Sequence, residues 1–283
     1  MMKRSIEWPG GKKICATLTV AFEAFKKTGR FKYEKGLDVN YTSISHANYG
    51  GNVGVWRTLE VLERNNMIAT IDFNGDAIEK WPEAAKALHE AGHEMTGHGI
   101  ANDTHMYELD AEGQRHEIRE CIRVCEETTG YRPVGWVGPG GLHTLDTLSI
   151  LAEEGITWCG DQCDDDIPYV VEVNGRRICI IPKLFYANDF RAWEGGLGNA
   201  ETFFQGFKEA FDYTYEEALR GRPGRIDALI HVELGARPHL MAGFERMLQY
   251  MNEYRDDLWL PNRRDIARYC LDTLEAEPYS PFG

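Results

Sequence analysis

The sequence predicts an α/β protein built on a parallel sheet or barrel, and three observations support this fold class. Short apolar, β-rich runs alternate with segments that carry apolar residues at helical spacing. Apolar residues make up 43% of the 283 positions, which is enough to bury a substantial core. The sequence contains no internal repeat, low-complexity run or long linker. We therefore expect a single domain that spans residues 1–283.

The expected strands are short, and several of them end at a polar residue or a turn signal. Residues 13–22 (KICATLTVAF) are the first case, because a continuous apolar run of this length is typical of a strand buried on both faces. The other expected strands share this short, β-rich composition and lie at residues 67–75, 93–99, 132–141, 156–162 and 225–235.

The expected helices separate these strands and place charged residues opposite an apolar stripe. They lie at residues 54–66, 81–92, 110–130, 144–155, 201–221, 240–254 and 263–276, with residues 201–221 expected as a helix pair. Asp110 is a candidate N-cap and Gly130 a candidate C-terminal stop. This alternation of strands and helices favours a parallel strand order.

Composition and charge exclude several classes of partner. The formal net charge is −14, whereas nucleic acids and anionic membranes need local positive charge on the protein, so we expect neither as a partner. The seven cysteines have no spacing typical of a disulfide framework or a zinc knuckle, and we expect reduced, mostly buried thiols. No signal peptide opens the sequence and no apolar run approaches ~20 residues, so we expect a cytoplasmic protein.

Polar residues follow four of the expected strands, at Glu23, His98, Asp161 and His231. In parallel barrels, catalytic groups lie at the carboxyl ends of the strands, which makes these four residues candidates. Structural alternatives remain open for them. Glu23 could be a buried carboxylate paired with backbone or an arginine, and His231 could satisfy a core network.

The loop after His98 adds further polar side chains, at Asn102, Asp103 and His105. Gly99 would let the backbone approach a ligand closely at this point. Each of the three residues could instead cap the next helix. Residues 91–105 (AGHEMTGHGIANDTH) could therefore supply metal ligands, catalytic groups or ordinary caps.

Several motifs along the chain carry a family resemblance. They are AFEAF, YGGNVGVWRTL, GHEMTGHG, TGYRPVGWVGP, DQCDDDIPY and NRRDIARY, in this order. Together they resemble the NodB-homology polysaccharide deacetylases (carbohydrate esterase family 4), most of all the allantoinase-like or cyclic imide hydrolase-like branch. The resemblance implies a distorted (β/α) barrel with fewer than eight regular units. It also implies an oligomer, and we expect a homo-oligomer.

The sequence departs from this family at its metal site, which the resemblance describes as an aspartate and two histidines four residues apart. Ala24 stands at the aspartate position and Asn102 at the second histidine. A methyl group cannot coordinate a metal, and an amide oxygen is a poor ligand for zinc. We therefore expect no metal in the usual arrangement. The candidate ligands for any other divalent ion, zinc or manganese, are His98, Asp103, His105 and Glu23.

The chemistry that fits these residues is hydrolysis of an amide C–N bond, which needs a base, an acid and a group that stabilises the oxyanion. Glu23 is the candidate base, His98 positions water, and His231 is the candidate acid. Asp161 is a candidate for orienting the partner of the base.

Further residues are candidates for binding the substrate. Tyr49, Trp56 and Trp136 could form walls around a small flat molecule, although tryptophan is more often a core residue. Arg57 could pair with Glu23 or a substrate carbonyl, or simply be solvated. The turn at residues 137–141, with Pro139 and Gly140, could present backbone N–H groups to the oxyanion or be only a tight turn.

Three functions remain open at this point. The first is a hydrolase of a small cyclic amide, imide or ureide, and we favour it. The second is a metal-dependent N-deacetylase of an acetylated sugar or peptidoglycan fragment, which the replaced ligands disfavour. The third is a non-catalytic binding protein on the same scaffold. In the first case the partner is a small-molecule substrate.

Overall fold

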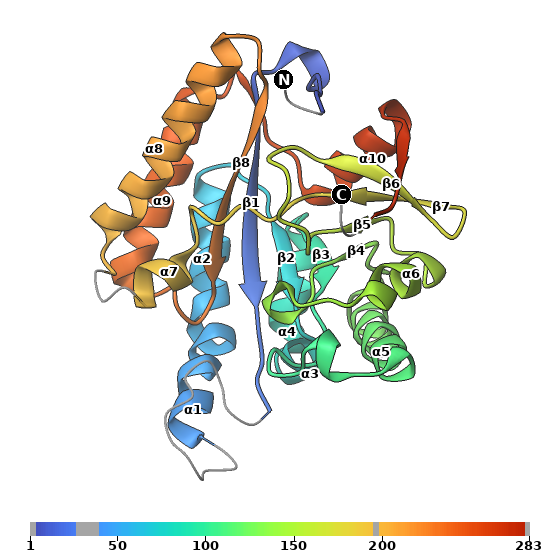
Figure 1. The fold of residues 1–283 in the computed structure, drawn as a ribbon. Helices are drawn as coiled ribbons and strands as arrows, with labels where there is room; N and C mark the ends of the chain where they lie inside the picture. Colours follow the sequence, from blue (N-terminus) through green and yellow to red (C-terminus); the bar gives the residue numbers. More distant parts are fainter. Residues whose placement is uncertain (1–3, 27–39, 195–197, 281–283) are drawn as a thin grey trace.

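One sheet organises the protein, and most of its strands run parallel (Figure 1). The computed structural model describes residues 4–26, 40–194 and 198–280. Within these ranges the strand order is β10-β6-β7-β5-β4-β3-β2-β1-β8, and β9 pairs with β1. The strands are β1 (Ile14–Phe22), β2 (Thr70–Phe73), β3 (Glu94–Gly97), β4 (Gly135–Trp136), β5 (Trp158–Cys159), β6 (Tyr169–Val173), β7 (Arg176–Ile180), β8 (Gly224–His231), β9 (Leu258–Trp259) and β10 (Ala276–Pro278).

Helices cover the outside of the sheet. They are α1 (Tyr41–Tyr49), α2 (Val55–Arg64), α3 (Gly75–Lys80), α4 (Pro82–Glu90), α5 (Ala111–Thr129), α6 (Leu145–Glu153), α7 (Asp189–Glu194), α8 (Ala200–Leu219), α9 (Pro238–Glu253) and α10 (Arg263–Thr273). α8 and α9 pack together over β8, and α3, α4 and α5 form a second group beside β3 (Figure 1). The apolar core lies between these helices and the sheet.

The central strand β1 fixes the position of the candidate site. All nine of its residues are buried, because β2 and β8 flank it in parallel and both of its faces are covered. Its register aligns Ala21 with Asp72 of β2 and with His231 of β8. Asp72 is in turn aligned with Thr96 of β3. The carboxyl ends of these four strands therefore meet at one end of the sheet.

An irregular segment, residues 181–188, closes the barrel between β5 and β8. At its start, Ile181 N donates to Cys159 O at 2.9 Å and Lys183 N donates to Gln162 O at 2.7 Å. At its end, Leu229 N of β8 donates to Ala187 O at 2.8 Å. This connection replaces a regular strand, and the expected α/β fold with a distorted barrel is confirmed.

The structure contains the expected strands and, apart from the helix pair, the expected helices, and it adds elements that were not expected, namely α1, α3, α7, β6, β7, β9 and β10. The Asp110 side chain accepts a hydrogen bond from Gly113 N at 2.9 Å, and Gly130 ends α5 with a φ of 75°, so both expected caps are confirmed. The expected helix pair at residues 201–221 is wrong, because α8 continues through Gly206 and its phenylalanines are buried. The hairpin of β6 and β7 was not expected, although its Asn174-Gly175 turn is a strong hairpin signal.

Two whole-chain features complete the fold. All seven cysteines are unpaired, and all but Cys163 are buried, in agreement with the expected burial; the reduced state remains a prediction. Over the described ranges, no helix combines the length and the apolar character that crossing a membrane would require.

Candidate functional site

A cavity of about 230 Å³ opens at the carboxyl ends of β1, β3 and β8. Polar and charged side chains dominate its lining, with two aromatic rings beside them. The lining residues are Ala21, Glu23, Asp72, His98, Asn102, Val137, Gly140, Lys183, Phe185, Asn188, Phe190, Arg191, Leu229 and His231. Three of the four predicted catalytic residues, Glu23, His98 and His231, are among them.

Strand geometry brings these three residues together. Glu23 follows β1 directly, His98 follows β3, and His231 is the last residue of β8. Glu23 Oε1 lies 3.4 Å from His98 Nε2 and 3.7 Å from His231 Nε2. All three side chains are buried, with Glu23 only 4% exposed. Residues separated in sequence by up to 208 positions therefore surround one carboxylate oxygen (231 − 23 = 208).

Asn102 links the carboxylate to the first histidine. Its Nδ2 donates to Glu23 Oε2 at 3.0 Å, and its Oδ1 lies 3.1 Å from His98 Nε2. Because an ionised carboxylate can only accept hydrogen bonds, this contact fixes which end of the amide faces His98. Asn102 is itself anchored by its backbone N–H, which donates to Ala24 O at 2.9 Å.

Both ring nitrogens of His98 face acceptors, which favours the doubly protonated imidazolium. Nε2 faces Asn102 Oδ1 and Glu23, while Nδ1 lies 2.5 Å from the Val137 carbonyl oxygen. Burial of His98 works against protonation, but the hydrogen bond and the charge of Glu23 outweigh it, so the pKa of His98 is raised. These contacts thus favour a cation immediately beside the Glu23 carboxylate.

His231 is oriented by an aspartate that the sequence analysis did not identify. Asp189 is fully buried at the start of α7, and its Oδ1 lies 2.6 Å from His231 Nδ1. Its Oδ2 accepts a second hydrogen bond, from His231 N at 2.8 Å. The carboxylate therefore holds the proton on Nδ1 and leaves Nε2 directed toward Glu23.

Asp161 takes a different position from the other catalytic candidates. It does not line the cavity; its Oδ1 accepts a hydrogen bond from Gly138 N at 2.7 Å. Burial raises the pKa of Asp161, while the Gly138 N–H opposes this effect. The carboxylate thus anchors the turn at residues 137–141, which contributes Val137 and Gly140 to the cavity lining. Pro139 of this turn packs beside Gly99 instead.

Four of the predicted substrate-binding residues, Tyr49, Trp56, Arg57 and Trp136, lie outside the lining of this cavity. Trp136 is fully buried and packs over Gly97 on the side of α5, not on the cavity side. The Arg57 guanidinium donates to the Tyr49 hydroxyl and to Ala236 O, the latter at 2.6 Å, so it does not pair with Glu23. Trp56 is 41% exposed on α2 and also lies outside the lining.

The side chains present do not fit the metal site that the family resemblance implies. Ala24 offers no ligand atom, and both ends of the Asn102 amide are engaged with Glu23 and His98. Asp103 accepts a hydrogen bond from Lys26 N at 3.0 Å, and His105 lies 3.5 Å from Glu108. Within residues 4–26, 40–194 and 198–280, no three His, Cys, Asp or Glu side chains gather in a metal-binding arrangement.

Several lining residues escaped the sequence analysis, and most of them follow β7. Lys183, Phe185, Asn188, Phe190 and Arg191 come from the closing segment and the start of α7. Residues 181–191 lack the alternation of apolar and polar residues that would predict a strand and its end. Asp72 is different, because a lone acid inside the apolar run of β2 was a usable signal of a buried polar site.

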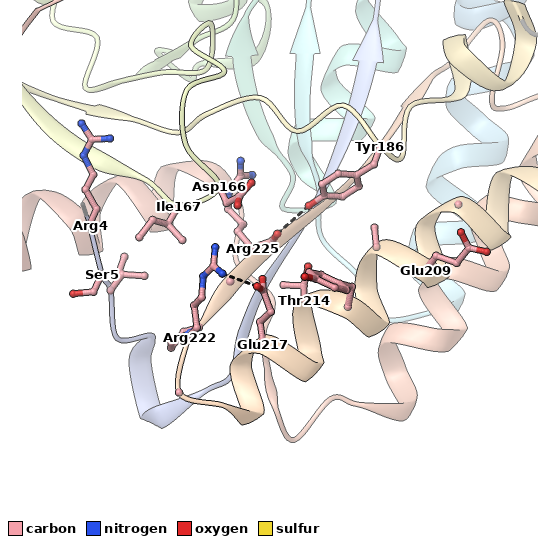
Figure 2. Close-up of a pocket in the computed structure, with 17 residues that line it drawn as sticks. Arg4, Ser5, Asp166, Ile167, Tyr186, Glu209, Thr214, Glu217, Arg222 and Arg225 are labelled. Carbon is pink, nitrogen blue, oxygen red and sulfur yellow. Dashed lines mark hydrogen bonds and ion pairs between the residues drawn. The ribbon is translucent and has the colours of Figure 1, made fainter. Parts of the chain in front are cut away.

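A second, larger cavity of about 880 Å³ lies at the opposite end of β8, where the strand begins (Figure 2). Tyr186 donates to Arg225 O at 3.0 Å there, and Arg222 pairs with Glu217 at 2.6 Å. None of the predicted catalytic residues lines this cavity. We assign the candidate active site to the smaller cavity, because a base, two histidines and their buried partners converge there.

Comparison with known proteins shows that the chain is similar to polysaccharide deacetylases and their relatives. The polysaccharide deacetylase family model matches residues 41–159. The peptidoglycan deacetylase-like protein FGM2 of Gibberella zeae is 31% identical over 260 residues, which cover 79% of this chain and 77% of that protein. The solved structure of a "probable polysaccharide deacetylase" from Pseudomonas aeruginosa PAO1 is 30% identical with a TM-score of 0.85, covering 96% of this chain and 95% of that one. PuuE allantoinase is 28% identical with a TM-score of 0.84, covering 96% and 94%.

Proposed function

Because the chain belongs to the polysaccharide deacetylase family and is a hydrolase of amide C–N bonds, we propose that its substrate is a small cyclic amide, imide or ureide. We propose further that the reaction needs no metal in the usual family site. The observation that carries this proposal is Asn102, which bridges Glu23 and His98 where the family resemblance implies a second metal-binding histidine. Similarity to PuuE allantoinase over nearly the whole chain supports the same substrate class.

The size of the cavity also favours a small substrate. Pockets for drug-sized ligands usually measure about 300–1,000 Å³. The cavity around Glu23 measures about 230 Å³, which suits a ring of five or six atoms better than a sugar chain. Phe185 and Phe190 supply apolar surface for the faces of such a ring.

In the proposed mechanism, Glu23 is the general base. It removes a proton from the attacking water, and its ionised form is held by Asn102 and by the His98 imidazolium. His98 orients the water beside Glu23 and places positive charge next to the carbonyl oxygen as that oxygen becomes negative. Lys183 and Arg191 add two cations to the same cavity lining, and their positive charge also stabilises the negative charge that develops on the carbonyl oxygen.

His231 is the proposed general acid for the leaving nitrogen. Asp189 stabilises the protonated ring through Nδ1, so Nε2 can deliver its proton into the cavity. The leaving nitrogen of a cyclic substrate stays attached to the product, since ring opening breaks one C–N bond and releases no separate amine. Glu23 thus gains one proton from water and His231 gives one to the nitrogen. Return of the Glu23 proton to His231 Nε2, which lies 3.7 Å from Glu23 Oε1, restores both groups for the next turnover.

A metal-dependent N-deacetylase is the second candidate, because the similar protein from Gibberella zeae is named a peptidoglycan deacetylase-like protein. One experiment separates the two functions. The purified protein is treated exhaustively with chelator, analysed for residual metal, and assayed on hydantoin, allantoin, succinimide and N-acetylglucosamine oligomers. Turnover of a cyclic amide that survives chelation supports our proposal. Release of acetate that requires added zinc or manganese would establish the deacetylase instead.

The expected homo-oligomer and cytoplasmic location remain predictions. Light scattering of the purified protein and fractionation of the source cells test them directly.

A further inference from the structure

The floor of the catalytic cavity carries a second carboxylate, Asp72, which the mechanism above does not use. Asp72 belongs to β2, lines the cavity and is only 3% exposed. The barrel register places it beside Ala21, which is in turn aligned with the catalytic candidate His231. Asp72 therefore lies in the layer directly below Glu23 and His98.

The two oxygens of Asp72 have different surroundings. Oδ2 lies 3.6 Å from Nη1 of Arg263, and this guanidinium also donates to Asp227 at 3.2 Å. Asp227 precedes His231 by four positions on β8, so Arg263 approaches from the amino-terminal side of the barrel. Oδ1 is buried and has no hydrogen-bond partner. Arg263 thus engages one oxygen and leaves the other without a hydrogen-bond partner, in a side chain that lines the cavity.

A buried acceptor without a partner is costly to a fold and is rare in proteins, so a ligand that supplies the missing donor is a physical explanation for it. The charges around Asp72 agree with this role. Burial raises the pKa of Asp72, and Asp227 adds to this rise, while the positive charges of Arg263, His98 and Lys183 oppose it and favour the ionised carboxylate. Hydrogen-bond donors are therefore the natural complement of Oδ1.

We propose that Asp72 Oδ1 accepts a hydrogen bond from a ring N–H of the substrate, and that this contact selects cyclic amides, imides and ureides that carry a free N–H. The inference rests on the proposed function and names the substrate group that Asp72 would recognise. In a ring amide, N–H and C=O point toward the same edge of the molecule. A ring can therefore present its N–H to Asp72 while the neighbouring carbonyl stays close to the cations of the lining.

The test compares substrates that differ by one methyl group. Wild-type kcat/KM is measured for hydantoin, 1-methylhydantoin and 3-methylhydantoin, and for succinimide and N-methylsuccinimide. A site built around a hydrogen bond rejects an analogue that lacks the donor by as much as about 10⁴-fold, so we expect methylation of the recognised nitrogen to lower kcat/KM at least ~10²-fold. Equal turnover of every methylated compound would overturn the proposal without affecting the proposed function.

Asp72→Asn tests the residue itself. Arg263 only donates hydrogen bonds, so the new amide will turn its oxygen toward Arg263 and its NH₂ toward the cavity. We expect kcat/KM for the N–H substrates to fall toward that of their methylated analogues, chiefly through KM, so that the discrimination disappears. An equal loss on both members of each pair would indicate a structural role and refute our inference.

Thr96→Val is the matched control. Thr96 lies next to Asp72 in the same barrel layer, is fully buried, and does not line the cavity. This variant removes a polar group from the layer and should keep the wild-type discrimination. Loss of discrimination in Thr96→Val would assign the effect to the layer as a whole and contradict a specific role for Asp72. If the wild type hydrolyses no cyclic amide but deacetylates sugar oligomers, both this inference and the proposed function fail.

Discussion

Replacing Asp189 by asparagine should disable the proposed acid while leaving the fold intact. The Asp189 carboxylate accepts two hydrogen bonds from His231, one from the backbone N at 2.8 Å and one from Nδ1 at 2.6 Å. An amide has only one oxygen, and the backbone N–H always needs an acceptor. The asparagine NH₂ therefore faces Nδ1, which must then lose its proton, and the imidazolium of His231 is no longer stabilised.

The magnitude follows from the type of bond that is lost. A hydrogen bond to a charged group contributes about 1.5–3 kcal/mol, which corresponds to a decrease in kcat of about 10- to 150-fold. The assay is steady-state turnover of the cyclic amide found in the substrate screen, with the melting temperature measured in parallel.

Glu117→Gln is the control for this variant. Glu117 is also a buried acid that accepts a backbone N–H, from Ile100 at 2.9 Å, but it does not line the cavity. We expect its kcat to remain at the wild-type level. A kcat for Asp189→Asn within about twofold of wild type would refute our account of His231 as an acid supported by Asp189.

Three further predictions concern single ionisable groups. Glu23→Gln should lower kcat about 10²–10⁴-fold with little change in melting temperature, and a variant with near wild-type kcat would remove Glu23 from the mechanism. The pKa of His98 is raised above its ordinary 6.5, so kcat/KM should decline as the pH rises through the raised value. The stability that the His98 imidazolium contributes is complete below pH 6.5 and should be lost over the same range. A pH profile of kcat/KM that stays flat on its alkaline side would contradict this prediction. Burial raises the pKa of Glu94 from 4.5 to about 7, so the free energy of unfolding should fall by about 3 kcal/mol as the pH rises through this interval. Urea titrations at several pH values should show a weaker pH dependence of this free energy in Glu94→Gln. An unchanged pH dependence in the variant would argue that Glu94 does not cause it.

Three catalytic candidates could be identified from sequence because each ends or follows an apolar strand. Glu23, His98 and His231 stand at such positions, and the parallel order of β1, β3 and β8 then brings them to one edge. The local sequence pattern was sufficient for these residues, because the common direction of parallel strands alone decides at which edge of the sheet a strand-end residue lies.

Asp189 could not be identified in this way. It follows a segment without regular hydrogen bonding, and only the closure of the barrel brings it to His231. The side of the sheet on which Trp136 lies could not be predicted for a different reason. β4 has only two residues, and a shift of one residue in a strand moves a side chain to the opposite face, so the sequence could not tell the cavity side from the side of α5.

The closing segment at residues 181–188 makes catalytic activity and global unfolding separable. The backbone of the segment meets β8 only around the Asn188–Leu229 bridge, and hydrogen bonds of Tyr186 and Pro182 with Arg225 add to this contact, whereas β1 and β8 pair along eight positions. Local opening of so short a ladder costs less free energy than unfolding of the central strands. Such an opening would separate Asp189 from His231 while the sheet stays folded. During gentle heating or at low denaturant, turnover should therefore be lost before circular dichroism changes, and amide hydrogens of this segment should exchange before those of β1.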